Sequence, residues 1–103
     1  MKKARVFVDG EPAGELHELK RGQHYRFVYD EKYQGPSVSL TMPTSAKVYD
    51  YDRFPPFFEG VLPEGIMLDG LLRQRKLDRN DLMGQLIAVG QDLVGNVTVE
   101  ELE

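Results

Sequence analysis

The chain has 103 residues, of which 41% are hydrophobic and 29% are charged, values typical of one compact globular domain. It contains no cysteine, which excludes disulfides, zinc–thiolate centres and cysteine nucleophiles. The formal net charge of −4 argues against attraction of the whole surface to nucleic acid. Arg5 and Asp9 interrupt the short apolar run at the N-terminus, which is too polar for a signal peptide, and no stretch approaches a membrane span. We therefore expect a cytoplasmic protein.

The first half of the chain predicts antiparallel β-strands. Residues 4–9 alternate as a strand with two unequal faces does, and the glycines and proline of residues 10–14 predict a turn. A weaker strand is expected over residues 13–19, followed by strands over residues 24–30 and 37–43, the last of which ends at a proline. Together they predict a small meander with one face buried and one exposed. The apolar or aromatic side chains expected to share a face are Ala4, Val6 and Val8, then Tyr25, Phe27 and Tyr29, then Val38, Leu40 and Met42.

The second half changes to a helical period, and a first helix is predicted from residue 63. Pro63 suits the first helical position, and Glu64 beside it complements the positive end of the helix dipole. Basic side chains crowd the other end, where cations are favoured. The apolar set between these ends is wider than one core-facing stripe requires: Ile66, Met67, Leu68, Leu71 and Leu72.

A second helix is predicted from Asp78, which is expected to be its N-cap, with Asp81 as a weaker version of the capping-box acid. Leu77 and Leu82 have the spacing of a hydrophobic staple around that cap. Gly90 is expected to end the helix in the left-handed conformation.

Residues 97–100 then predict a last strand, which returns to the sheet. The expected fold class is therefore α+β: a small antiparallel β-sheet (meander) followed by two packed helices and a short final strand. We expect residues 1–103 to form a single domain.

The residue pattern offers no catalytic constellation. The two histidines, His17 and His24, lie seven residues apart on predicted strands without metal-ligand spacing, so imidazoles on a sheet are the favoured interpretation. No serine lies in the nucleophile elbow of a hydrolase, and the sequence shows no pair of carboxylates shielded from water that could act as general acid and base. The glycines of "VDGEPAG" are explained by a hairpin and not by a phosphate-binding loop. We predict no catalytic, cofactor-binding or metal-binding residue, and no enzyme.

One basic cluster, "RQRKLDR", follows the first predicted helix. Cations complement the negative end of a helix dipole, and this interpretation is favoured over a nucleic-acid contact. A carboxylate patch on a partner is a third possibility. The four basic residues are Arg73, Arg75, Lys76 and Arg79.

Aromatic side chains crowd residues 49–58, and about half of them are expected to fill the core between sheet and helices. One irregular loop cannot easily point all of them inward. Together with Ile66 and Met67 on a helix whose apolar arc is too wide, they predict an exposed hydrophobic patch, which usually marks an interface. The aromatics are Tyr49, Tyr51, Phe54, Phe57 and Phe58.

Several stretches occur in the order of the small N-terminal subdomain of HipA-type serine/threonine kinase toxins, which the chain resembles from Ala4 to Val99: "VDGEPAGEL", "YRFVYDEKY", "SVSLTMP", "FFEGVLPEG" and "DLMGQLIAVGQDLVGNV". The most specific is "FFEGVLPEG", similar to the family's Phe-Phe-x-x-Leu-Leu-Pro-Glu-Gly, with Val61 where leucine is usual. "GQDLVGNV" departs from the family's Gly-x-Asp-Cys-Ala-Gly-Ala at Leu93 and Val94. The family's basic residue soon after Pro-Glu-Gly is also absent.

A HipA kinase continues into a large catalytic region, whereas this sequence resembles the free-standing small subunit, HipS, of tripartite HipBST toxin–antitoxin systems. The resemblance implies a non-catalytic antitoxin that binds and neutralises a HipT-like serine/threonine kinase. A HipB-like helix-turn-helix protein would join through the complex, without direct nucleic-acid or membrane binding and without a cofactor. The residues expected to contact the kinase are Phe57, Phe58, Leu62, Pro63, Glu64, Gly65, Ile66 and Met67.

Three alternatives stay open from the sequence. The chain would be an excised N-terminal structural subdomain of a single-chain HipA-type kinase, with its apolar patch an intramolecular interface. It would otherwise be an unrelated acidic protein-interaction module, or a nucleic-acid binder through residues 73–79.

Overall fold

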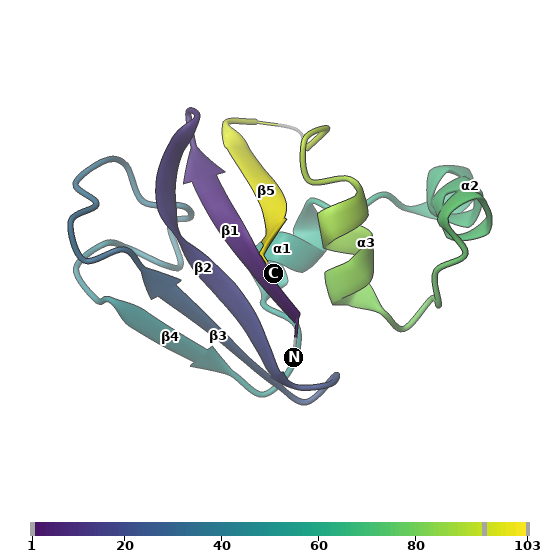
Figure 1. Ribbon diagram of the computed structural model, residues 1–103, viewed down its shortest axis with the longest axis horizontal. Helices are drawn as coiled ribbons and strands as arrows, with labels where there is room; N and C mark the ends of the chain where they lie inside the picture. Colours follow the sequence, from purple (N-terminus) through teal and green to yellow (C-terminus); the bar gives the residue numbers. More distant parts are fainter. Residues whose placement is uncertain (1, 94, 103) are drawn as a thin grey trace.

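The computed structural model describes residues 2–93 and 95–102 (Figure 1). Within these residues lies a five-stranded antiparallel sheet of order β4-β3-β2-β1-β5, accompanied by three short helices. The α+β class and the return of the final strand to the sheet are confirmed, and that strand pairs with β1. In chain order the elements are β1 (Lys2–Val8), β2 (Glu11–Lys20), β3 (His24–Tyr29), β4 (Val48–Tyr51), α1 (Pro56–Gly60), α2 (Gly65–Arg75), α3 (Leu82–Ala88) and β5 (Val97–Leu102).

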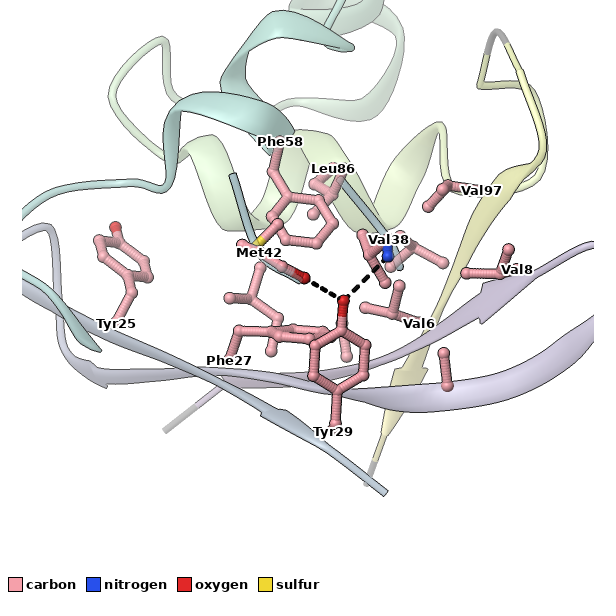
Figure 2. Packing of buried hydrophobic residues seen from close by; sticks show 14 of the residues in the cluster. Val6, Val8, Tyr25, Phe27, Tyr29, Val38, Met42, Phe58, Leu86 and Val97 are labelled. Atoms are coloured by element: carbon pink, nitrogen blue, oxygen red, sulfur yellow. Dashed lines mark hydrogen bonds between the residues drawn. The ribbon is translucent and has the colours of Figure 1, made fainter. Parts of the chain in front are cut away.

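The core lies on one face of the sheet, beneath α1 and α3 (Figures 1 and 2). Alternation along β1, β3 and β5 sends every second side chain to this face, as their period predicts. The ring of Phe58 from α1 packs against that of Phe27 from β3, with centroids 6.1 Å apart. The largest side chains buried here are Leu16, Tyr25, Phe27, Met42, Phe58, Met83 and Leu86.

The fourth strand is not the predicted one. Residues 37–43 form a turn with an isolated bridge between Ser39 and Met42, and β4 pairs with β3 in their place. The hydroxyl of Tyr29 explains the turn, because it accepts a hydrogen bond from the Val38 amide and donates one to the Met42 carbonyl (Figure 2). Val38 and Met42 are therefore buried, whereas Leu40 at the apex is 100% exposed and does not share their face.

The helix starts also differ from the predictions. An additional helix, α1, begins at Pro56, a position that suits proline because the first turn needs no amide donor. The next helix, α2, begins at Gly65, two residues after Pro63, which is therefore not its first residue. The cap of α3 is Asp81, whose Oδ1 accepts from the Gly84 amide at 2.9 Å, so the N-cap predicted at Asp78 is wrong.

Gly90 does not end α3 in the left-handed conformation that was predicted. It is absent from the glycines with positive φ, and its amide contributes to the end of α3 by donating to the Ile87 carbonyl. A Cβ added at Gly90 would lie 2.0 Å from the Val99 carbonyl oxygen. The Val99 amide also donates to the Gly90 carbonyl at 2.9 Å, so Gly90 lets the end of α3 approach β5 closely.

Candidate protein-interaction surface

The helix α2 protrudes at one end of the molecule, beyond α3 as seen from the sheet (Figure 1). Its N-cap Glu64 is extended, and Gly65 enters the helix with φ of 58°, a left-handed value that favours glycine. Lys76 ends the helix, also in the left-handed conformation, and donates its amide to the Leu72 carbonyl. The chain therefore turns sharply at both ends of α2, which points this helix away from the core.

None of the residues in α2 is buried, although five of its eleven side chains are leucine, isoleucine or methionine. Ile66 is 89% exposed and Met67 is 76% exposed. The leucines of α2 are half-buried and face the rest of the molecule. The predicted exposure of the surplus apolar side chains is thus confirmed at Ile66 and Met67.

A groove of about 630 Å³ runs between α2 and the end of α3. One wall is formed by Met67 and Leu71 of α2, and the opposite wall by Val89 and Leu93, with Asp92 as its carboxylate. The end of α1 and its connection to α2 also line the groove, through Gly60, Val61, Leu62 and Pro63. We define this groove together with the exposed side chains of Ile66 and Met67 as the α2 surface.

The structure divides the residues expected to contact a partner. Phe58 is fully buried and Leu62 is 9% exposed, so both support the surface from beneath rather than present side chains to a partner. Phe57 and Pro63 are half-buried. The accessible residues of the set are Glu64, Gly65, Ile66 and Met67.

Sequence reasoning missed the second wall of the groove. Val89 and Leu93 follow α3, and neither was among the residues expected to contact a partner. Both are half-buried, whereas Met83 and Leu86 of α3 are fully buried in the core. The available signal was the helical spacing of Leu86, Val89 and Leu93, which continues past the end of α3.

Basic side chains lie at the C-terminal end of α2, as the dipole argument predicts. Arg79 pairs with Asp69 at 2.6 Å, across the return of the chain toward α3. The ion pairs formed among residues 2–93 and 95–102 include neither Arg73 nor Arg75. Both side chains are exposed, so these two charges are available to a partner.

The sheet face opposite the core carries a network of charged side chains. His17 contacts Glu15 at 2.8 Å, and this hydrogen bond, with the nearby charges of His17 and Arg5, lowers the pKa of Glu15 against the effect of partial burial. The hydrogen bond from Arg26, at 2.7 Å, is the main reason that the pKa of Asp50 is lowered, with His24 adding to it. The two histidines therefore contact surface carboxylates, as expected of imidazoles on a sheet.

Other candidate sites have little support in the part of the chain that the structure describes. A shallow open hollow of about 680 Å³ lies at the β3–β4 edge, next to His24 and Asp50. Within residues 2–93 and 95–102, no three histidine, aspartate or glutamate side chains are grouped as metal ligands would be. The described helices are also too short or too polar to cross a membrane.

Comparison with known proteins identifies the relatives of this chain. The family model of the HipA N-terminal domain matches residues 4–100. An uncharacterized protein of Haemophilus influenzae is 31% identical over 101 residues, which cover 98% of this chain and 93% of that protein. A solved structure described as the N-terminal domain of HipA toxin superposes with a TM-score of 0.78 at 28% identity, covering 100% of this chain and 94% of the other. The chain therefore belongs to the HipA N-terminal domain family, and this domain is a non-catalytic subdomain.

Proposed function

We propose that this protein is a non-catalytic antitoxin that binds and neutralises a HipT- or HipA-like serine/threonine kinase toxin. The observation that carries the proposal is the exposure of Ile66 and Met67 on a helix that buries none of its residues. Family membership supports the choice of a HipA-like kinase as the partner. A HipB-like helix-turn-helix protein would join the assembly through the kinase, as in a tripartite toxin–antitoxin system.

Free energy for association would come from the α2 surface. Full burial of an isoleucine or methionine side chain contributes about 1.5–3 kcal/mol, so the two exposed side chains offer several kcal/mol before the cost of ordering is subtracted. The half-exposed groove beside them adds apolar area. A partner that covers this surface would be held through a few central side chains, as in most protein interfaces.

The test is a double substitution, Ile66→Asp with Met67→Asp, assayed for binding to the kinase and for rescue of kinase-inhibited growth. Both sites are exposed, so circular dichroism and the melting temperature should change little. The matched control is Leu40→Asp, the same kind of substitution at a fully exposed apolar residue in the loop before β4.

We expect the double variant to lose binding and neutralisation while Leu40→Asp retains both. The kinase for this assay is identified by affinity pull-down from the native cells and mass spectrometry. Neutralisation that survives in the double variant would remove the α2 surface from the proposal. Recovery of unrelated proteins alone would favour a general acidic interaction module in place of the antitoxin.

The second candidate is the N-terminal structural subdomain of a single-chain HipA-type kinase. It is favoured by the likeness to a structure described as the N-terminal domain of HipA toxin. The α2 surface would then pack against the same polypeptide. The downstream reading frame distinguishes the two: a new start codon indicates a free subunit, and continuous coding into a kinase region indicates a subdomain.

A further inference from the structure

The outward side of α2 combines apolar, small and basic residues. With 3.6 residues per turn, Ile66, Gly70, Arg73 and Gln74 lie on the same side of the helix, and all four are exposed. Leu68, Leu71 and Leu72 lie on the other side and are half-buried. Asp69 is also exposed on this side, where Arg79 pairs with it. The outward side therefore begins apolar at Ile66, has no side chain at Gly70 and carries the positive charge of Arg73.

Gly70 has no evident role in the isolated chain. It lies in the interior of α2 with negative φ, where glycine is less favourable than alanine because its backbone loses more entropy. A Cβ added there would meet no described atom within 4 Å outside its own stretch of helix. Gly90 offers the contrast, because its neighbour Val99 leaves no room for a side chain.

The charge of this segment is opposite to that of the rest of the protein. Residues 65–79 contain four basic and two acidic side chains, a formal charge of +2 in a chain of net charge −4, which leaves −6 elsewhere. Arg79 is paired with Asp69, whereas Arg73 projects from the outward side next to Gly70. A partner that covers this side gains by presenting carboxylates close to Arg73.

We propose that the outward side of α2 docks onto an apolar hollow flanked by carboxylates on the kinase, and that Gly70 is the point of closest backbone approach. This inference rests on the proposed function and extends the interface beyond Ile66 and Met67 toward the C-terminal end of α2. Ile66 fills the hollow, Arg73 pairs with its acidic rim, and the missing side chain at Gly70 lets the two backbones come together.

The first experiment is a graded series at position 70, Gly70→Ala and Gly70→Leu, with binding to the kinase and thermal melting measured on the same samples. Alanine and leucine are better helix formers than glycine, so the melting temperature should rise or stay unchanged. Affinity for the kinase should fall progressively, by roughly threefold to tenfold for alanine and by more for leucine, as an inserted side chain separates the surfaces. A merely structural role of Gly70 cannot produce this opposition between stability and affinity.

The second experiment compares Arg73→Glu with Arg75→Glu. Both arginines are exposed in the last turn of α2, so the change in net charge and in helix-dipole energy is matched. Arg75 lies about 200° further around the helix than Arg73, on the opposite side. We expect Arg73→Glu to weaken binding by at least roughly tenfold and to reduce its salt dependence, with Arg75→Glu within about threefold of the unmodified protein.

The outcomes separate this inference from the function on which it rests. If the unmodified protein binds no HipA-like kinase, the proposed function fails. If it binds and the Gly70 and Arg73 variants bind equally well, the function stands and this docking geometry is overturned. If the protein alone forms a dimer that Gly70→Leu abolishes, or if Arg73→Glu selectively abolishes retention on nucleic acid, the kinase is the wrong occupant of this surface.

Discussion

The sheet core and helix α2 both contain apolar side chains but use them in opposite ways. The strands alternate, so their apolar residues converge on one face and are covered by Phe58, Met83 and Leu86. The apolar residues of α2 surround much of the helix, and none of them is buried. The difference shows that the chain carries more hydrophobic surface than its own fold can cover, and that two of the exposed large hydrophobic residues, Ile66 and Met67, lie side by side at the start of α2.

Two local features keep α2 away from the core. The segment from Leu62 to Glu64 leads from α1 to an extended residue, and Gly65 then starts the helix in a left-handed conformation. At the other end, Lys76 turns the chain back toward α3. Substitutions in the core should therefore change the stability of the protein, whereas substitutions on α2 should change its proposed binding to a partner. Substitutions in each region can test this division between core and α2.

The largest effect is expected in the core. Phe58→Ala should lower the free energy of unfolding by about 3–5 kcal/mol, because it removes a fully buried ring that packs on Phe27 and Phe57. Urea denaturation followed by circular dichroism measures the loss. Met67→Ala is the comparison in α2 and should stay within about 0.5 kcal/mol of the unmodified protein. Similar losses for both variants would contradict the division between core and α2.

The next largest effect on stability is expected from alanine substitutions at two glycines. Gly90→Ala should destabilise the fold by about 1–3 kcal/mol, because the added methyl group would overlap the Val99 carbonyl oxygen. Gly70→Ala should stabilise it by up to about 1 kcal/mol, since that position is open and alanine is the better helix former. Denaturant midpoints of the two variants should move in opposite directions, and a shared direction would refute the packing role of Gly90.

A smaller effect concerns Asp81, which joins α3 to β1 by capping the helix and contacting Lys2 at 2.7 Å. Partial burial raises the pKa of Asp81, but the hydrogen bonds from Lys2 and from the Gly84 amide outweigh it, so its pKa is lowered. Asp81→Ala should cost about 1–2 kcal/mol near neutral pH.

The pH dependence of this cost has a definite sign. A carboxylate whose pKa is lower in the folded than in the unfolded state adds stability above the unfolded value, near 3.9 for aspartate. That contribution is lost as pH falls through the lowered folded value. The stability difference between the unmodified protein and Asp81→Ala should therefore shrink below about pH 4, and a difference independent of pH would show that the charge of Asp81 contributes nothing.

The smallest effect is expected within α2 itself. Leu72→Ala should change the global free energy of unfolding by less than about 1 kcal/mol, because Leu72 is half-buried in an element outside the core. Hydrogen exchange should show α2 amides opening at lower free energy than those of β1 and β2, and Leu72→Ala should widen that gap. Equal protection in α2 and the central strands would place α2 in the same cooperative unit as the sheet.

Local patterns predicted the strands well wherever a period of two coincided with burial on one face, as in residues 4–8 and 24–29. The same pattern over residues 37–43 failed, because the buried hydroxyl of Tyr29 holds Val38 and Met42 in a turn. For the candidate surface, the sequence predicted the excess of apolar residues around Ile66. It did not separate Phe58 and Leu62, which are buried, from the accessible residues beside them.

By itself, therefore, the sequence determined the antiparallel strands, the helical period of the second half and the surplus of apolar side chains in residues 66–72, because these depend on neighbours within a few residues. The tertiary structure decided which strand occupies the β4 edge, which aspartate caps α3, why residue 90 is glycine and which side of α2 is exposed. Each of these depends on contacts between residues distant in the sequence, such as Val99 against Gly90 or Lys2 against Asp81. Such contacts form only when the whole chain packs, and no local pattern of residues encodes them.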